Sequence, residues 1–476
     1  MEKIAGIDFG TTYSRIAFIQ DGRPFLIPFQ NGSGLLPSLV LYTPSQAILV
    51  GEKAKENYFQ YPKSSILHVK RYLGQNFQFH LNDRIFSAEE LSSYIFRELK
   101  YQAEIFLKEK IEKAVVTVPT YFNHFQREAT IQAAQCAGWK VLQLLNEPTA
   151  AALAYRCNQG QNSQKIMICD LGGGTFDVSV LDINQENFKV KSTSGDPHLG
   201  GMDWDRALYR FFEHKLHQEF DKKALSTAFV RDKLWKSCEK LKETLSFQEQ
   251  AILSTPIIVG HAGFLKNYTY KMSRQEFADM TRHLIGGLEV PLKQALSSAR
   301  ISSTDLDRVI LVGGSTFIPQ VRYFLETFLG VPIEAGVNPE KVVAMGAAIY
   351  STQSHLQEVT PLSLSVKSHK QGSSMMIKKN TPLPITQTKR FKITGEDPAS
   401  FDVYVYQGKK EIPNKDYLIG KISLKKFLLN PNKEQDIEVT FFVDVSGRIS
   451  VFAKELTSQE ELEVILENTK TISYQK

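Results

Sequence analysis

Three glycine-rich segments, each following a short apolar run, carry the residue types best suited to phosphate chemistry. They read IAGIDFGTTYS (4–14), IMICDLGGGTFDVSVL (166–181) and VILVGGSTFIPQV (309–321). Glycine lets the backbone approach a phosphate, and successive N–H groups and threonine hydroxyls then donate to its oxygens. The first two segments also place Asp8 and Asp170 at a strand end, where carboxylates can hold the Mg²⁺ that accompanies a phosphate. Together the segments predict a nucleotide held between two related halves.

The elements around these segments alternate between strand and helix patterns up to about residue 355, which predicts an α/β architecture. Helical spacing is clearest in 88–111, 124–139 and 230–246. After about residue 356, short alternating runs separated by Asn, Pro, Gly and Lys take over, and VDVSGRIS (443–450) is typical of a β-hairpin. We therefore expect a separate all-β domain to follow the α/β part.

The composition describes an ordinary globular protein. With 476 residues, 42% hydrophobic and 23% charged, the chain is expected to form roughly two to four domains. The net charge of +6 is spread along the chain, which disfavours nucleic-acid and membrane binding. Cys136, Cys157, Cys169 and Cys238 show no spacing typical of zinc sites or disulfides. The N-terminus does not look like a signal peptide, and no apolar run reaches the roughly 18 residues of a membrane span, so we expect a cytoplasmic protein.

In order along the chain, the motifs resemble those of the DnaK-type heat-shock chaperones within the actin-like ATPase superfamily. The resemblance covers nearly the whole chain and rests on DFGTTYS, VTVPTYFNHFQREAT, NEPTAAALAY, DLGGGTFDVSVLD, GDPHLGGMDWD, LVGGSTFIPQV and NPEKVVAMGAA. In the β region it continues through TPLSL, KKNTPLP, VYQGKK and VDVSGRISVFAKE. The compact segment between Lys70 and Pro119 is most similar to the short bacterial members of the family.

The resemblance implies a two-lobed α/β ATPase domain over residues 1–355, with lobes at about 1–165 and 166–355. It also implies a short, degenerate linker at 356–361 and an all-β sandwich at 362–476 that binds substrate. Because the chain ends soon after the last expected strand, the helical lid of the family is expected to be missing, and bound peptide should then exchange quickly.

The resemblance also assigns catalytic roles. Lys70 matches the lysine that neutralises charge on the transferring γ-phosphoryl group, and Glu147 matches the carboxylate that orients the attacking water. Asp8 and Asp170 match the carboxylates that hold hydrated Mg²⁺, and Thr175 completes the catalytic set with Asp170. The cofactors implied are ATP or ADP and Mg²⁺.

Plainer interpretations of single residues remain open. Outside its motif, Lys70 is a solvated surface lysine, and Glu147 is a residue that starts a helix before Pro148. Asp177 can simply cap or brace the second hairpin.

The remaining nucleotide contacts implied by the resemblance are Gly10, Thr11, Thr12, Tyr13, Gly172, Gly173, Gly174, Gly200, Gly201, Glu239, Lys242, Ser246, Gly313, Gly314, Ser315 and Phe317. At the adenine end the chain departs from the family. Phe317 stands where an arginine usually stacks on the base, and Glu243 stands where some members carry a second arginine. Since a phenyl ring can also stack on a purine, we expect ATP to bind with looser purine selectivity.

The parts that couple the ATPase to a chaperone are matched unevenly. Pro119 and Arg127 match the family's switch proline and its arginine. The linker region SHLQEVTPLS (354–363) has lost most of the usual leucine run, and Leu356 alone buries little apolar surface. Gln143 replaces an arginine that usually contacts the J-domain in the family, and His124 replaces a usual aspartate. The usual J-domain partner is therefore in doubt, while a nucleotide-exchange factor remains possible.

The expected peptide-binding residues lie in the β region. By their place in the strands they are Val366, His369, Phe391, Thr394, Phe401 and Val403. Phe401 replaces a smaller aliphatic residue and would fill the pocket meant for a client side chain. The alternative is ordinary drift in the core of a β-sandwich.

Three functions compete at this point. The first is an ATP-hydrolysing chaperone that binds extended polypeptides under nucleotide control. The second is a nucleotide-controlled interaction protein whose β domain binds one specific partner, with weak or no general chaperone activity. The third and weakest is a small-molecule kinase of the same superfamily, for which the sequence shows no pocket for a second substrate.

Overall fold

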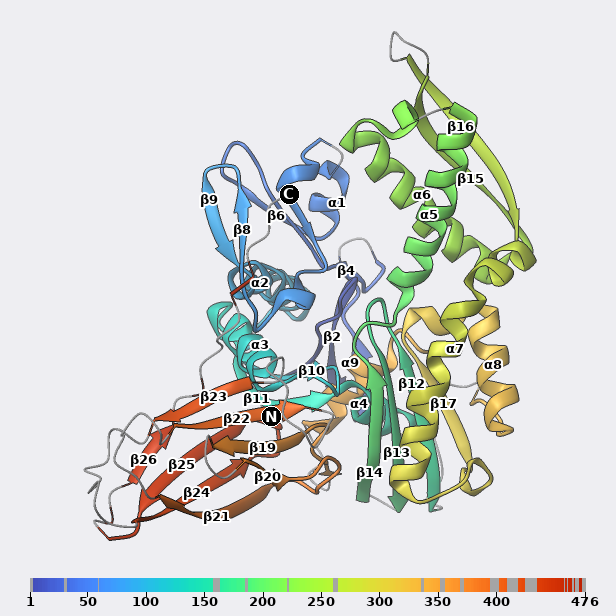
Figure 1. Ribbon diagram of the computed structural model, residues 1–476. Helices are drawn as coiled ribbons and strands as arrows, with labels where there is room; N and C mark the ends of the chain where they lie inside the picture. The colour runs from blue at the N-terminus through green and yellow to red at the C-terminus, as the bar shows by residue number, and fades with distance from the viewer. Residues whose placement is uncertain are drawn as a thin grey trace.

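The computed structural model describes residues 3–29, 32–58, 60–156, 163–184, 187–220, 222–259, 264–334, 338–351, 356–368, 372–393, 402–408, 418–423, 435–457, 459, 461–464, 466 and 471–472. It is a mixed α/β structure with several sheets (Figure 1).

The first part of the chain is organised around a six-stranded sheet with the order β11-β10-β1-β2-β3, in which β4 also pairs with β2. These strands are β1 (Ile4–Asp8), β2 (Tyr13–Gln20), β3 (Arg23–Leu26), β4 (Leu36–Pro37), β10 (Lys113–Val118) and β11 (Lys140–Asn146). Two small sheets adjoin it: β6-β5-β7, made of β5 (Leu39–Tyr42), β6 (Ile48–Val50) and β7 (Ser65–Leu67), and β27-β8-β9, made of β8 (Asn76–Leu81), β9 (Arg84–Ser87) and β27 (Thr471–Ile472). The helices are α1 (Glu52–Asn57), α2 (Ala88–Leu107), α3 (His124–Cys136) and α4 (Glu147–Arg156).

The second part repeats the arrangement with a five-stranded sheet of order β17-β12-β13-β14-β18. Its strands are β12 (Gln164–Leu171), β13 (Phe176–Asn184), β14 (Asn187–Asp196), β17 (Arg308–Val312) and β18 (Leu356–Gln357); β15 (Gln250–Val259) and β16 (Phe264–Ser273) form a separate hairpin. The helices are α5 (Gly201–Phe220), α6 (Ala228–Phe247), α7 (Arg274–Ala299), α8 (Pro319–Leu329) and α9 (Val342–Tyr350). In the first sheet a glycine-rich turn joins the antiparallel strands β1 and β2, and β10 lies parallel to β1. In the second sheet a glycine-rich turn joins β12 and β13 in the same way, and β17 lies parallel to β12.

Local sequence signals set the helix ends. The Ser87 hydroxyl accepts a hydrogen bond from the Glu90 N–H and begins α2, and Lys108, with a left-handed φ of 55°, ends it. Asn123 and Gln126 form a capping box at the start of α3. The helices expected at 88–111 and 124–139 therefore exist but end three or four residues earlier than the sequence pattern predicts. The third expected helix, 230–246, is longer at both ends and forms α6.

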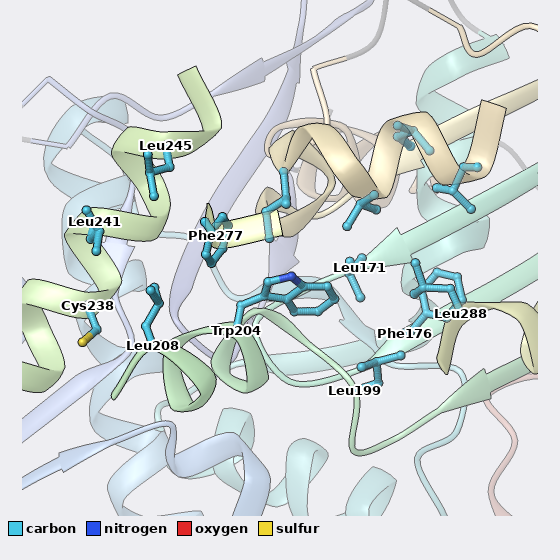
Figure 2. Packing of buried hydrophobic residues seen from close by; sticks show 14 of the residues in the cluster. Leu171, Phe176, Leu199, Trp204, Leu208, Cys238, Leu241, Leu245, Phe277 and Leu288 are labelled. Atoms are coloured by element: carbon cyan, nitrogen blue, oxygen red, sulfur yellow. The ribbon is translucent and has the colours of Figure 1, made fainter. Parts of the chain in front are cut away.

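Each half has its own hydrophobic cluster. In the second half, Trp204 of α5 is fully buried and is surrounded by Leu208, Phe277 and Leu171 (Figure 2). A third cluster joins the halves through α4 and α9, where small residues let the backbones approach closely. A Cβ on Gly346 would lie 1.7 Å from the Ala150 carbonyl oxygen, so only glycine fits there. Cys169 is buried within β12.

The last part of the chain consists of two four-stranded antiparallel sheets (Figure 1). One has the order β20-β19-β22-β23, made of β19 (Ser363–Ser368), β20 (Gly372–Ile377), β22 (Asp402–Gly408) and β23 (Leu418–Ser423). The other has the order β21-β24-β25-β26, made of β21 (Ile385–Ile393), β24 (Gln435–Val443), β25 (Ile449–Glu455) and β26 (Glu461–Val464). The two sheets share one hydrophobic cluster, and the expected hairpin is formed by β24 and β25.

The segment at 356–361 is more structured than its sequence indicates. Leu356 and Gln357 form β18 and lie parallel to Phe188 and Lys189 at the edge of the second sheet. Strand pairing uses main-chain groups, which do not depend on a leucine run. The following Val359 is also buried. The loss of leucines therefore does not prevent this segment from adding a strand to the sheet.

Candidate functional site

A cavity of about 420 Å³ lies where the glycine-rich turns of the two α/β halves face each other. Most residues predicted for nucleotide or metal binding line it: Asp8, Gly10, Thr11, Thr12, Tyr13, Lys70, Glu147, Asp170, Gly172, Gly173, Thr175, Lys242, Ser246, Gly313, Gly314, Ser315 and Phe317. The fold thus brings together side chains that are up to about 300 residues apart in sequence.

Four predicted contacts, Gly174, Gly200, Gly201 and Glu239, do not line the cavity. Gly200 packs behind the second turn, where a Cβ would lie 2.4 Å from the Gly174 nitrogen. The Gly201 N–H donates to the Gly172 carbonyl at 3.0 Å. Glu239 accepts a hydrogen bond from the Trp235 ring N–H at 3.0 Å. Gly200 and Gly201 therefore contact the second turn, to which Gly174 itself belongs, and the assignment of these residues and Glu239 to nucleotide binding stays a prediction.

Several lining residues were not predicted as contacts: Arg15, Leu35, Phe247, Val312, Ile318, Pro339, Glu340 and Val343, while Pro119 and Glu243 were noted for other reasons. Arg15 directly follows the first glycine-rich turn and lies 3.4 Å from Asp8 and 3.8 Å from Glu340. Its place after DFGTTYS was the available signal. Phe247 follows Ser246 at the end of α6, where helical spacing alone does not indicate whether its ring enters the cavity.

The geometry of the glycine-rich turns requires glycine. At Gly313, φ is +84° and a Cβ would lie 2.3 Å from the Leu171 carbonyl oxygen. At Gly173 a Cβ would lie 2.6 Å from the Thr12 hydroxyl, so the first and second turns touch across the cavity. The Ser38 hydroxyl donates to the Gly10 carbonyl at 2.8 Å and fixes the first turn. A phosphate held here would meet backbone N–H groups from both sides.

Lys70 and Glu147 form a buried ion pair across the cavity. The Lys70 ammonium lies 2.7 Å from a Glu147 carboxylate oxygen, and Lys70 is only 3% exposed. Burial raises the pKa of Glu147 above its ordinary value, although Lys70 opposes this shift. A buried lysine next to a carboxylate at the start of α4 can exchange this partner for an incoming phosphate, which would free the carboxylate.

Carboxylates accumulate around this pair. Burial, reinforced by Glu147, Asp177 and Asp8, raises the pKa of Asp170 well above its ordinary value. Such crowded carboxylates favour a cation. Among the described residues, no group of three or more His, Cys, Asp or Glu side chains could hold a metal by themselves. Mg²⁺ does not need such a group, because it binds through one or two carboxylates together with phosphates and water. Asp8 and Asp170 therefore fit Mg²⁺.

The far end of the cavity is aromatic. The rings of Phe247 and Phe317 lie 5.6 Å apart at an angle of 48°, and Phe247 is 70% exposed. Lys242 is held by Asp205 at 2.7 Å, and the Ser246 hydroxyl donates to the Lys242 carbonyl. These two polar groups already have partners within the protein, while the phenyl rings offer flat apolar surfaces beside them.

A second set of buried contacts joins α3 to the β strands. Arg127 is 2% exposed and donates to the carbonyl oxygens of Phe122, Thr120 and Ser446 and to the Asn146 side chain, at 2.9–3.0 Å. Burial lowers the pKa of Arg127 to about 10. The guanidinium therefore connects the residue next to Glu147 with the turn between β24 and β25.

His124 lies in the same contact. Its backbone N–H donates to the Gln407 side-chain oxygen at 2.9 Å, and its ring Nδ1 accepts a hydrogen bond from the Ile449 backbone N–H at 3.2 Å. Neither His124 nor Phe125, which packs against the cluster of the β strands, was predicted to make this contact.

The residues predicted for peptide binding are only partly described. Val366 and Phe391 are 1% and 8% exposed and belong to the hydrophobic cluster between the two β sheets. The backbone of Val403 pairs with Ser368 and Ile422. His369, Thr394 and Phe401 lie outside the described residues.

The related sheets, the glycine-rich turns and the buried Lys70–Glu147 pair define a class of α/β protein whose cavity suits a nucleotide phosphate. The chain belongs to the Hsp70 protein family, whose model matches residues 4–82 and 77–476. It is similar to the chaperone protein DnaK of Mycoplasmopsis agalactiae (strain NCTC 10123 / CIP 59.7 / PG2), with 35% identity over 480 residues that cover 99% of this chain and 80% of the relative. Members of this family bind ATP and ADP and hydrolyse ATP, so this chain is an ATPase. No helix in the described part of the chain is long and apolar enough to cross a membrane.

Proposed function

We propose that the protein is a chaperone in which ATP hydrolysis at the cavity controls how the β region, residues 362–476, binds extended polypeptide segments. We further propose a nucleotide-binding domain over residues 1–355 and a β-sandwich domain after it. The observation that carries this proposal is the buried Arg127, which donates to Asn146, the neighbour of Glu147, and to Ser446 of the β region. A change at the cavity can reach the β strands through this guanidinium.

In the cavity, the glycine-rich turns would bind the phosphates through backbone N–H groups, with the Thr12 and Thr175 hydroxyls as further donors. Asp8 and Asp170 would hold Mg²⁺, which supplies positive charge at the phosphates when it is bound. Lys70 would turn from Glu147 to the transferring γ-phosphoryl group and neutralise its charge. Glu147, released from Lys70, would then orient the attacking water and accept its proton.

At the base end, we propose that Phe317, next to Phe247, stacks on the purine and that selectivity for adenine is weaker than is usual in the family. Stacking tolerates any purine because each base offers a similar aromatic face. Competition of GTP against labelled ATP tests this point. A strong preference for ATP would contradict weak selectivity without affecting the proposed hydrolysis.

A second candidate function is a nucleotide-controlled interaction protein whose β region binds one specific partner. The observation that favours it is the burial of Val366 and Phe391 in the cluster between the sheets. Two side chains expected in an open peptide pocket instead pack inside the β region, which leaves less apolar surface for a general client.

Single-turnover ATP hydrolysis, with and without a long apolar peptide, tests the proposal and separates the two candidates. A chaperone should hydrolyse ATP faster with the peptide, and Arg127→Ala should retain hydrolysis but lose the acceleration. Arg322→Ala, which removes an exposed arginine on α8, serves as the control. Hydrolysis that ignores every apolar peptide would support the specific-partner function, and acceleration that survives in Arg127→Ala would exclude the proposed route.

A further inference from the structure

A groove of about 590 Å³ lies between α5 and α7, on the second α/β half and separate from the nucleotide cavity. Figure 1 shows these two helices on the side of the molecule opposite β8 and β9. The residues that line the groove are Asp203, Arg206, Ala207, Arg210, Phe211, His214, Lys215, Gln218, Met280, His283 and Leu284. Its size fits a few side chains of a partner, or a small molecule.

The apolar part of the groove is held in place by the core. Phe211, Met280 and Leu284 are half-buried and pack against the cluster around Trp204. The Phe211 ring also makes edge contacts with Phe212 at 5.1 Å and Tyr270 at 6.0 Å. Because these contacts fix the side chains before any partner arrives, little conformational entropy would be lost when the groove is filled.

The groove carries more positive than negative charge. Arg206, Arg210 and Lys215 line it against one carboxylate, Asp203, which is already paired with Arg206 at 2.6 Å. Lys215 pairs with Glu219 at 3.1 Å and lies over the Tyr270 ring.

Two further groups in the groove are exposed and polar. Within the described residues, Arg210 and His283 have no hydrogen bond or ion pair, and both are exposed. An incoming carboxylate would meet at least one unpaired cation beside apolar side chains.

We propose that this groove is a docking site for a short amphipathic segment of a partner protein, in which apolar side chains alternate with Asp or Glu. The apolar anchors would contact Phe211, Met280 and Leu284, and the carboxylates would lie near Arg210 and His283. A nucleic acid fits less well, since phosphates gain nothing from the apolar residues and the cations form no extended stripe. Charge complementarity of this kind mainly speeds association and selects the partner.

The test uses the full chain and a short fluorescein-labelled peptide in which leucines alternate with pairs of glutamates, followed by fluorescence anisotropy. We expect binding that weakens with salt and that falls roughly tenfold in the double variant Arg210→Glu/His283→Glu. Arg282→Glu is the control for the Arg210→Glu part of the variant, because it makes the same replacement on α7 at a side chain that is 79% exposed and does not line the groove. ATP hydrolysis and the melting temperature of each variant show that the fold is intact.

Several outcomes would overturn the proposal. Equal affinity of the wild type and the double variant would do so, and so would an equal loss in Arg282→Glu or equal binding of a peptide with lysines in place of the glutamates. Displacement by an uncharged leucine-rich peptide would place the labelled peptide at a client site in the β region instead. Charge-dependent binding of single-stranded RNA with no binding of the peptide would make the groove a nucleic-acid site.

Discussion

The nucleotide cavity and the contact between α3 and the β strands both bury charge, but they leave it in different states. In the cavity, Lys70 pairs with Glu147, and the pKa of Asp170 is raised by burial and by the neighbouring Glu147, Asp177 and Asp8. In the contact, Arg127 donates to four oxygens that need no further partner. The cavity is therefore arranged for a charged ligand, whereas the contact is complete without one.

The two regions also differ in how far apart their residues lie in sequence. Most of the cavity residues predicted to bind phosphate come from short motifs that each supply several neighbouring residues. The contact joins single residues, such as Arg127 and Ser446 or His124 and Ile449, that are 319 and 325 positions apart. A change in the cavity should thus affect chemistry first, and a change in the contact should affect stability and communication first.

The largest effect is expected for Lys70→Ala. Removing the cation that we propose to neutralise the transferring phosphoryl group should lower single-turnover ATP hydrolysis by roughly a hundredfold or more. Lys293→Ala, at an exposed lysine on α7, is the control. Near-normal hydrolysis in Lys70→Ala would remove this side chain from the catalytic set, and nucleotide binding measured in parallel separates lost chemistry from lost binding.

Arg127→Ala should have the next largest effect, and on the other side of the comparison. The change leaves buried carbonyl oxygens without donors and should lower the free energy of unfolding by about 3 kcal/mol. Chemical denaturation measures this loss. The Leu144 N–H donates to the Ser446 hydroxyl at 3.2 Å, so hydrogen exchange at the Leu144 and Ile449 amides should report the opening of the contact. Arg127→Lys should recover only part of the stability, because an ammonium cannot reach all four acceptors. Unchanged exchange at both amides would show that Arg127 does not hold the contact.

Phe317→Ala brings the comparison back to the cavity with a smaller effect. Loss of the ring that we place against the base should weaken ATP binding by at least about fivefold, since stacking contributes about 1–3 kcal/mol per base. The dissociation constant for ATP is the quantity to measure. Tyr323→Ala, at a ring that is 71% exposed on α8, should leave it unchanged. A variant that weakens ATP and GTP equally would support stacking without selection of the base.

The contact should also depend on pH through His124. Burial lowers the pKa of His124; Glu128 and Asp444 oppose this shift, and Arg448 and Arg127 add to it. The neutral ring is needed because its Nδ1 accepts from the Ile449 N–H. A histidine with a lowered folded-state pKa contributes its full stability above the unfolded value of about 6.5 and loses it as the pH falls below that value.

The protection factor of the Ile449 amide, which corrects the exchange rate for its intrinsic pH dependence, should therefore fall between about pH 7 and pH 5.5, by an amount equivalent to about 1 kcal/mol. The asparagine side chain in His124→Asn does not titrate in this range, so the same measurement on this variant should show a flatter pH dependence. Equal slopes in the two proteins would assign the pH dependence to other groups.

The smallest effect is expected for Arg448→Ala. Arg448 pairs with Glu128 across the same contact, but the two side chains are 45% and 37% exposed. Solvent screens such pairs, so the loss should be only about 0.2–1 kcal/mol. A double-mutant cycle with Glu128→Ala measures it. A coupling as large as the loss in Arg127→Ala would mean that the rim of the contact, and not its buried centre, holds the β strands.

Much of the cavity was predictable from sequence because glycine-rich turns are local. The backbone geometry of a glycine-rich turn is indicated by the turn's own residues. This holds for Gly10 to Tyr13 and for Gly172 to Thr175, and most of these residues line the cavity. Gly174, Gly200, Gly201 and Glu239 do not line the cavity, because a motif shows which residues are near a site without showing which face they present. Phe247 was missed for the same reason.

The α/β pattern, the later change to short strands and the chemical groups available for phosphate binding could all be predicted from the sequence, because periodicity and turn residues act over a few neighbouring positions. Three contacts could be found only in the folded structure. They are the ion pair of Lys70 with Glu147, the ring contact of Phe247 with Phe317 and the hydrogen bond from Arg127 to Ser446. The tertiary structure also decided that Leu356 adds a strand beside β14 despite the missing leucines. Such pairs depend on how distant elements pack, and no local pattern records the distance between two side chains that only the folded core brings together.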